Sequence, residues 1–213
     1  MDRTQIINYL AKKINAKAYL EIGVRDHSEN FDKINIQDKT GVDPCHEYFD
    51  REPTFKLTSD VFFAKNTETF DIIFIDGLHE AEQVERDILN SLHILNTDGF
   101  IVCHDMNPAI YERQLLKDDP KRLEYSLREE AKGNPEYGLW NGDCWKAFIK
   151  IRSEREDLCM TTVDTDFGCG IISRGNQRIL DVEPVNLHYQ NLQKNRKEWL
   201  NLISVDEFLN LYI

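Results

Sequence analysis

The sequence predicts an α/β protein with a doubly wound, mostly parallel sheet in a three-layer α/β/α arrangement. Short apolar strands alternate with amphipathic helices over residues 2–105, which is typical of parallel β-α-β units. Residues 70–76 are almost entirely apolar, as a parallel strand covered on both faces requires. Two strand-like segments, residues 158–163 and 168–173, adjoin across a short turn and predict an antiparallel hairpin at the edge of the sheet.

The elements follow from the spacing of apolar residues. Residues 2–17 predict an amphipathic helix with an apolar face formed by Ile6, Ile7, Leu10 and Ile14. Strands are expected at residues 18–24, 39–44 and, more weakly, 54–59. The strand at residues 70–76 leads into a helix over residues 80–95, followed by a turn at residues 96–99 and a strand at residues 100–105.

The second half of the chain interrupts this pattern. Residues 106–142 are highly charged and rich in proline and glycine, which is typical of a lid, a substrate loop or a contact surface. A helix is expected at residues 143–153, and another near residues 205–212. We therefore expect one domain over residues 1–175, with residues 106–142 as a lid-like insertion, and a C-terminal extension over residues 176–213 packed on the same domain.

The composition excludes several classes of protein. The chain has 213 residues, with 26 basic and 38 acidic side chains (26 − 38 = −12), and this net charge argues against a nucleic-acid binder. No apolar run reaches the roughly 18 residues of a membrane span, and no signal peptide is evident, so a cytoplasmic location is expected. The five cysteines are odd in number and show no CxxC pair, which favours reduced thiols.

Polar side chains follow five of the predicted strands. Because the carboxyl ends of parallel strands meet along one edge, these residues are expected to line one ligand crevice. They are Glu21, Gly23, Asp43, Ser59, Asp60, Asp76, His104 and Asp105. The alternative is that some of them only cap turns and helices where the strands end.

Five segments carry a resemblance to a known family. They are YLEIGV (19–24), GVDP (41–44), TSD (58–60), FDIIFIDGLHEAEQVERDI (70–88) and LNTDGFIVCHD (95–105). In this order and spacing the chain resembles the class I S-adenosylmethionine-dependent methyltransferases over roughly residues 19–173, and more narrowly their small-molecule and sugar O-methyltransferase branch. WNGDCWKAF (140–148) and VDTDFGCGII (163–172) resemble parts of a bacterial subgroup associated with surface-polysaccharide biosynthesis. The resemblance implies a Rossmann-like fold.

The resemblance also implies where the cofactor S-adenosylmethionine lies. Glu21 and Gly23 would lie under its methionine moiety, and Asp43 would accept hydrogen bonds from its ribose hydroxyls. Asp60 and Val61 would border the adenine, with Asp76 also beside the cofactor. The first turn keeps one glycine instead of two or three, and this absence of a GxGxxG fingerprint counts against a nicotinamide enzyme.

A metal and a general base are expected beside the cofactor. Asp76, His104 and Asp105 resemble the ligand positions of metal-dependent O-methyltransferases. Oxygen ligands from Asp76 and Asp105 would suit Mg²⁺ or Mn²⁺, and an imidazole from His104 or His79 would shift the preference toward a transition metal. His104 and His79 are the candidate general bases, because imidazole titrates near neutral pH. The alternative is that Asp76 contacts only the cofactor or caps the next helix, while His104 bonds a backbone carbonyl.

Residues 137–145 are the candidate acceptor platform, because their aromatic side chains are suited to stacking on sugar rings. The alternative is core packing by Trp145 and a helix cap by Asp143. Asp164 and Asp166 would close the acceptor pocket or merely stabilise a turn.

The function expected from all of this is methyl transfer to a hydroxyl of a sugar or other small polyol, with metal assistance and a homo-oligomeric state left open. Two alternatives are kept. One is a nucleotide-dependent oxidoreductase or hydroxylase-like enzyme on the same scaffold, and the other is a non-catalytic binding or assembly protein.

Overall fold

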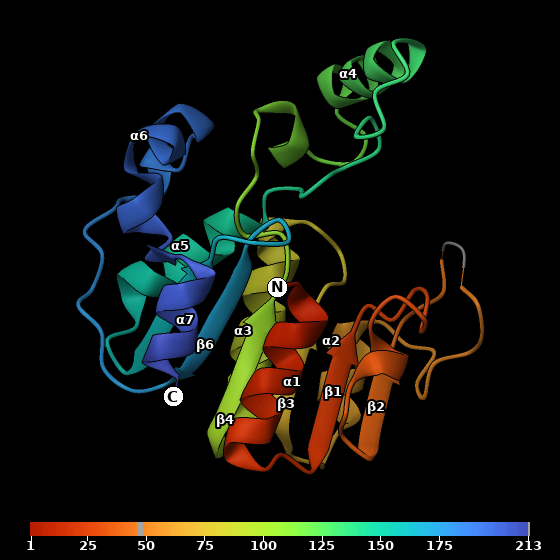
Figure 1. The fold of residues 1–213 in the computed structure, drawn as a ribbon, viewed down its shortest axis with the longest axis vertical. Helices are drawn as coiled ribbons and strands as arrows, with labels where there is room; N and C mark the ends of the chain where they lie inside the picture. Colours follow the sequence, from red (N-terminus) through yellow and green to blue (C-terminus); the bar gives the residue numbers. More distant parts are fainter. Residues whose placement is uncertain (47–48, 213) are drawn as a thin grey trace.

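The computed structural model describes residues 1–46 and 49–212, which fold around a seven-stranded sheet (Figure 1). The strand order is β2-β1-β3-β4-β6-β5-β7. The strands are β1 (Ala18–Ile22), β2 (Asp38–Val42), β3 (Phe70–Ile75), β4 (Leu95–Cys103), β5 (Leu158–Val163), β6 (Cys169–Arg174) and β7 (Leu202–Ile203). The first four strands are parallel, and β6 pairs antiparallel with both β4 and β5. The predicted doubly wound, mostly parallel sheet with an antiparallel pair is confirmed.

Helices cover both faces of this sheet. They are α1 (Arg3–Ile14), α2 (Ser59–Lys65), α3 (Ala81–Ile94), α4 (Pro120–Ala131), α5 (Cys144–Glu154), α6 (Tyr189–Trp199) and α7 (Val205–Leu211), with short 3₁₀ turns η1 (Phe31–Lys33), η2 (Glu112–Gln114) and η3 (Pro184–Asn186). One apolar cluster joins the sheet to α1 and α7, and a second joins its other face to α2, α3, α5 and α6. The architecture is therefore three-layered, with α1 and α7 on the near side in Figure 1.

The position of β1 decides where a ligand can bind. β1 pairs with β2 on one side and β3 on the other, so the chain winds outward in one direction and then in the opposite one. Ligands of such sheets bind outside the carboxyl ends of the strands at this reversal. Ile72, Ile73 and Phe74 of β3 are at most 1% exposed, because helices cover the strand on both faces, as its apolar sequence predicted.

Helix α1 begins and ends as its sequence specifies. The Asp2 side chain accepts a hydrogen bond from the Gln5 amide, while the Gln5 side chain accepts one from the Asp2 amide, which completes a capping box. Asn15 ends the helix in the left-handed conformation. Ile6, Ile7 and Leu10 are fully buried, so this amphipathic helix fixes the N-terminal segment against the sheet.

Two local expectations were wrong. Residues 54–59 do not form a third strand, because only Phe55 bridges to Val42 before Thr58 caps α2. Residues 96–99, expected to form a turn, lie within β4, whose pairing with β3 shifts register at this point. The Asn96 side-chain amide donates a hydrogen bond to the Asp71 carboxylate. The cap of α2 thus ends the extended segment at residues 54–59, and pairing of Leu95 and Phe100 with β3 keeps residues 96–99 within the strand.

The C-terminal segment contains the predicted helix α7 and two further elements that the sequence did not predict, β7 and α6. Strand β7 pairs in parallel with β5 and takes the outer position in the sheet beyond the hairpin. Helix α6 is mostly polar, and it is anchored by three buried side chains, Tyr189, Leu192 and Trp199. Sparse anchoring of this kind leaves only a weak periodic signal in the sequence.

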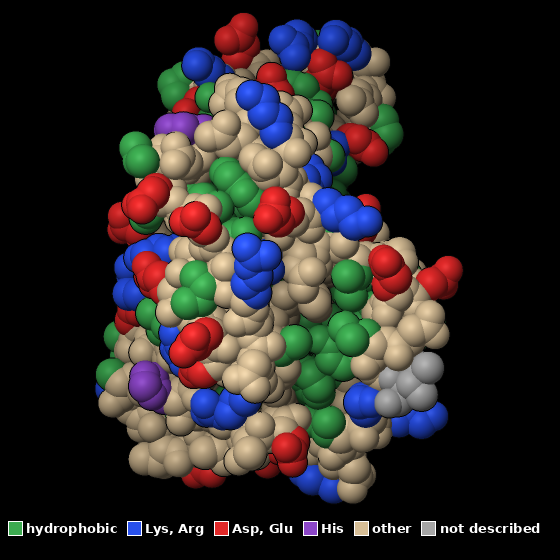
Figure 2. All heavy atoms as spheres, turned by 90° about the vertical axis from the view of Figure 1, so that its left-hand side faces the viewer, with side chains coloured by type: hydrophobic (Ala, Val, Ile, Leu, Met, Phe, Trp, Pro, Cys, Tyr) green, Lys and Arg blue, Asp and Glu red, His purple; other side chains and the backbone are tan. Residues whose placement is uncertain are grey.

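The described surface is mixed in charge. On the face shown in Figure 2, acidic, basic and hydrophobic side chains are interspersed. Among residues 1–46 and 49–212, no helix has the length and apolar character needed to cross a membrane. All five cysteines are free thiols, and three of them, Cys103, Cys144 and Cys169, are buried.

Candidate active site

Backbone hydrogen bonds bring the ends of four strands together. The Gly23 amide donates to the Val42 carbonyl at 2.8 Å, and the Asp76 amide donates to the Ile22 carbonyl at 2.9 Å. The His104 amide in turn donates to the Ile75 carbonyl at 3.0 Å. The residues that follow β1, β2, β3 and β4 therefore lie along one edge of the sheet, as the strand pattern predicted.

Two carboxylates and two imidazoles converge after β3 and β4. His79 Nε2 lies 3.4 Å from both Asp76 Oδ1 and Asp105 Oδ2. His104 Nδ1 lies 3.3 Å from Asp76 Oδ1 and 3.0 Å from Asp105 Oδ2. The side chains of Asp76 and His79 are each 20% exposed, whereas those of Asp105 and His104 are 4% and 6% exposed. The first pair can thus reach a ligand, and the second pair lies behind it.

These groups strongly shift one another's protonation. Burial opposes the charged forms, but the neighbouring imidazoles of His104 and His79 hold the pKa of Asp76 well below its usual range. In the same way burial acts against a charged His104, but Asp76 and Asp105 raise the pKa of His104 well above that of free imidazole. His104 is therefore an imidazolium among carboxylates at neutral pH, which is a poor state for a general base.

A strained turn brings a third carboxylate to His104. Asp166, Phe167 and Gly168 all have positive φ angles, of 45°, 65° and 89°. In this conformation Asp166 Oδ1 lies 3.6 Å from His104 Nε2, and the Phe167 ring meets the imidazole edge-on at 5.8 Å. Strain of this kind persists only where the surroundings enforce it, and it is common at functional sites.

The N-terminal helix supports that turn. The Arg3 amide donates to Asp166 Oδ2 at 2.8 Å, and the Arg3 guanidinium lies 3.3 Å from the same oxygen. Burial opposes ionisation of Asp166, but the neighbouring His104 imidazole and the hydrogen bond from the Arg3 backbone amide lower its pKa to about 2. Arg3 had no sequence signal, because a single polar residue at the start of a helix is common. Asp166 had been weighed only as a pocket or turn residue.

The end of the 106–142 insertion contacts the cluster at its buried side and at His79. The Asn141 side chain donates to Asp105 Oδ1 at 2.9 Å. Gly142 has a φ of 63°, and a Cβ there would lie 1.9 Å from the His79 carbonyl oxygen. This position therefore requires glycine if His79 is to keep its place. Neither residue was singled out from the sequence, because each is one polar or small residue in a loop.

The aromatic side chains of the platform expected at residues 137–145 lie in different settings, with Tyr137 40% exposed. The Trp140 ring stacks on His79 with centroids 4.7 Å apart, and the Arg122 guanidinium lies 5.3 Å from the Trp140 ring. Trp145 is fully buried in the core. Asp143 does not cap its own helix; its carboxylate accepts instead from the Ala81 amide at 2.7 Å and caps α3. These residues hold His79 in place.

One set of side chains has the geometry of a metal site. Asp76, His79 and Asp105 each offer one donor atom, and the three atoms lie within 4.8 Å of one another. Two carboxylate oxygens and one imidazole nitrogen suit Mn²⁺ or Mg²⁺. His79 takes the place that the sequence had given to His104, which reaches the same carboxylates from the buried side. The donors present thus fit a divalent cation.

The cofactor half of the edge carries fewer contacts. Gly23 has a φ of 93°, and a Cβ there would strike the Asp76 carbonyl oxygen at 2.3 Å, so glycine is required at this turn. Asp43 follows β2 directly, and its carboxylate accepts from the Cys45 amide at 2.6 Å. A carboxylate beside a turn without a side chain fits a ribose diol, so the residues present suit S-adenosylmethionine.

The other predicted cofactor residues lie in two different settings. Glu21 is 2% exposed and accepts hydrogen bonds from Tyr19 and Asn30, at 2.5 and 2.8 Å. Burial raises the pKa of Glu21 to about 7. Asp60 and Val61 begin α2 and are exposed, and the Asp60 carboxylate accepts from Gln83 and faces Arg86 of α3. Glu21 is therefore held under the edge, whereas Asp60 lies at its rim.

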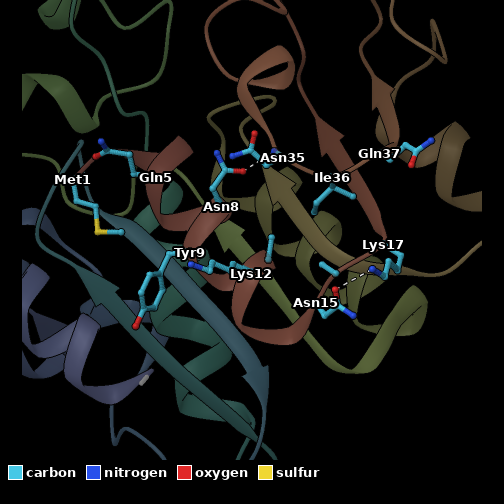
Figure 3. A pocket seen from close by; sticks show the side chains of 12 residues that line it. Met1, Gln5, Asn8, Tyr9, Lys12, Asn15, Lys17, Asn35, Ile36 and Gln37 are labelled. Atoms are coloured by element: carbon cyan, nitrogen blue, oxygen red, sulfur yellow. Dashed lines mark hydrogen bonds between the residues drawn. The ribbon is translucent and has the colours of Figure 1, made fainter.

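A hollow in the described surface lies away from this edge. It has a volume of about 730 Å³ and runs along α1 and the segment before β2 (Figure 3). Tyr9, Lys12 and Lys17 line it together with amide side chains. Because it holds no cluster of titratable groups like that after β3 and β4, we place the chemistry at the edge of the sheet.

Part of the chain matches a known family in sequence. Residues 10–106 match a family model described as a methyltransferase domain. This match spans the strand ends that carry Glu21, Gly23, Asp43, Asp76 and Asp105. No curated protein matches the chain in sequence.

Solved structures share the fold at low identity. An O-methyltransferase from Streptomyces achromogenes, TomG, solved with S-adenosylmethionine, is 11% identical with a TM-score of 0.50 over 82% of this chain and 80% of its own. An O-methyltransferase from Bacillus cereus with S-adenosylhomocysteine is 12% identical, TM-score 0.49, over 81% and 80%. A methyltransferase from Podospora anserina with the same ligand is 15% identical, TM-score 0.47, over 83% and 80%.

The chain therefore shares the fold of an O-methyltransferase solved with S-adenosylmethionine, and residues 10–106 match a methyltransferase domain in sequence. This confirms the resemblance found in the sequence.

Proposed function

We propose that this protein transfers the methyl group of S-adenosylmethionine to a hydroxyl oxygen of a sugar or another small polyol, with the help of a divalent cation. The observation that carries the proposal is the triad of Asp76, His79 and Asp105 beside the cofactor edge. The matched methyltransferase domain supports the cofactor. Two of the structures named above are O-methyltransferases, which supports an oxygen atom as the acceptor.

The chemistry asks little of the protein beyond placement. The sulfonium of S-adenosylmethionine is already activated, so the acceptor oxygen must lie in line with the methyl group and lose its proton. A divalent cation at the triad would orient a vicinal diol and lower the pKa of its hydroxyl. Asp76 and His79 face the ligand side, and Asp105 is held behind them by Asn141 and His104.

The two histidines then have different roles. His79 is assigned as a cation ligand, because its Nε2 points at both carboxylates and its ring is partly exposed. His104 is assigned as the residue that holds Asp76 and Asp105 in position from the buried side. The predicted base role of His104 is disfavoured, since both of its ring nitrogens face carboxylates.

Gly23, Asp43, Asp60 and Val61 are proposed to bind the cofactor. Glu21 is proposed to support this turn through its bonds to Tyr19 and Asn30. The acidic net charge agrees with a small-molecule acceptor and no nucleic acid. A cytoplasmic location and a place in polysaccharide biosynthesis belong to the same proposal, as does the division into residues 1–175 and a packed extension over 176–213.

Calorimetric titration with S-adenosylhomocysteine tests the cofactor, and Mn²⁺ titration of the same protein tests the cation. Saturable binding of both, with Mn²⁺ binding lost in Asp76→Asn, is expected. No binding of S-adenosylhomocysteine would refute the methyltransferase, and nicotinamide nucleotides would then be titrated. Normal cofactor binding without Mn²⁺ binding would refute only the cation and return His79 to the role of base. A screen of hydroxylated acceptors with labelled cofactor then identifies the substrate class.

A further inference from the structure

Helix α4 carries its apolar side chains on the outside. None of the 12 residues of α4 is buried, and the helix projects away from the sheet in Figure 1. Its inner face is held by polar contacts, among them Ser126 Oγ donating to the Tyr137 carbonyl at 3.0 Å. An isolated helix of this length is only marginally stable in water, and most of the stability of a helix comes from packing of its apolar face. An apolar face without a partner therefore leaves α4 without this stabilisation.

The outer face of α4 has a narrow apolar stripe. Pro120, Leu123, Leu127 and Ala131 are spaced three, four and four residues apart, which places them on one side of the helix. Leu123 is 44% exposed and Leu127 is 66% exposed. Leu116, just before the helix, is 46% exposed and adds to the same apolar surface. These side chains lie opposite the face that contacts residues 132–140.

Two opposite charges border the apolar stripe, in an arrangement that can pair with the same two charges of a second copy. Glu124 and Arg128 lie along one edge of it, four residues apart, which is the spacing of Leu123 and Leu127. The Arg128 side chain is 54% exposed, and its contacts are to the neighbouring Glu129 and to the Tyr125 ring. Both members of this oppositely charged pair thus remain accessible to a partner.

We propose that α4 docks against α4 of a second copy of this chain in antiparallel orientation. A two-fold axis passing beside residues 125 and 126 brings Leu123 of each copy to Leu127 of the other. The same axis brings Glu124 of each copy to Arg128 of the other. Such a self-complementary patch is what a two-fold symmetric dimer requires.

The charges favour a second copy over a membrane surface. A helix that lies on a membrane carries a broad apolar face bordered mainly by lysine and arginine. Here the stripe is narrow and is bordered by Glu124 and Glu130 as well as Arg128. Since one short helix covers less surface than a permanent dimer needs, the association is reversible and depends on protein concentration.

Sedimentation velocity of the full chain over a range of concentrations tests the dimer. Glu124→Arg places two arginines opposite each other at each contact, and Arg128→Glu places two glutamates there. Each variant is expected to weaken dimerisation by about tenfold or more, because like charges face each other twice. A matched control, Glu68→Arg, changes an exposed charge between α2 and β3 and leaves dimerisation unchanged.

Mixing the two variants gives the sharpest result. In the mixed pair, positions 124 and 128 are both arginine in the Glu124→Arg copy and both glutamate in the Arg128→Glu copy. Opposite charges then face each other at both contacts, so a heterodimer forms although neither variant forms a homodimer. A monomer at all concentrations would overturn the proposal, as would a dimer that survives both single substitutions. Circular dichroism checks that both variants are folded, and the result is independent of methyl transfer.

Discussion

The two halves of the ligand edge are built differently. After β3 and β4, four side chains lie in mutual contact, and Asp166 and Asn141 hold them from behind. After β1 and β2, Gly23 and Asp43 offer an open turn and a carboxylate with a backbone contact. The first half is fixed before a ligand arrives, whereas the second supplies surfaces that a ligand completes. Precise placement is thus concentrated where we propose that the methyl group is transferred.

The largest effect is expected at the pre-organised half. Asp105→Asn keeps the side-chain shape and tolerates the positive φ of 66°, but it removes the negative charge and one accepting oxygen. Because loss of an outer-shell partner already costs about 10–100-fold in metal affinity, loss of a ligand is expected to cost more than about 100-fold. Mn²⁺ titration measures this. Unchanged Mn²⁺ affinity in the folded variant would remove Asp105 from the cation site.

A substitution in the cofactor half is expected to change the affinity for S-adenosylhomocysteine and not the affinity for Mn²⁺. Asp43→Ala removes the proposed ribose acceptor and should weaken S-adenosylhomocysteine binding by roughly 1.5–3 kcal/mol, the range for hydrogen bonds to charged groups. Mn²⁺ affinity should stay the same. Asp38→Ala, an exposed position at the start of β2, is the matched control. Equal cofactor affinity in the two variants would exclude the ribose contact.

A smaller change in Mn²⁺ affinity tests whether the contacts of Asp166 position the cluster of side chains after β3 and β4. Asp166→Asn weakens the contacts to His104 and Arg3 without touching the triad directly. We expect Mn²⁺ affinity to fall by about tenfold, the low end for a supporting partner, while cofactor affinity is kept. Asp164→Asn in the same turn serves as the control. Equal Mn²⁺ affinity in both variants would show that the strained turn does not position the cluster.

A change at Glu21 is expected to affect the stability of the fold and its dependence on pH. The pKa of Glu21 is about 7 in the folded chain, above its value of 4.5 when exposed, so the folded state binds the proton more tightly. Stability from this group is present at low pH and declines as pH rises from about 4.5 to 7. Glu21→Gln should remove this decline and gain roughly 2 kcal/mol relative to the natural chain at pH 8.

Urea unfolding of both proteins at pH 4.5 and pH 8 measures the difference. Glu68→Gln is the exposed control and should follow the natural chain at both pH values. If Glu21→Gln shows the same pH dependence as the natural chain, Glu21 is ionised in the folded protein and the burial argument fails.

Much of the fold could be predicted from local pattern. The apolar run of β3 and the periodic leucines and isoleucines of α1 and α3 each determine their element, because burial of one face leaves a repeated signal. The strand predicted at residues 54–59 and the turn predicted at residues 96–99 were wrong, because the composition of each segment does not strongly favour one conformation. Pairing with Val42 or with β3 decided their conformation. Helix α6 was not predicted, because its three buried side chains in a polar sequence give only a weak helical periodicity of apolar residues.

The sequence by itself determined the order of the strands' polar ends, and so which of Asp43, Asp76, His104 and Asp105 share one edge. Parallel strands of similar length leave no other arrangement. Only the tertiary structure decided that His79 faces the carboxylates and that the Trp140 ring stacks on it. It also brought Arg3 and Asp166 behind His104, across 163 residues of chain. Such contacts depend on loop paths and on strain at Asp166 and Gly142, which leave no periodic trace in the sequence.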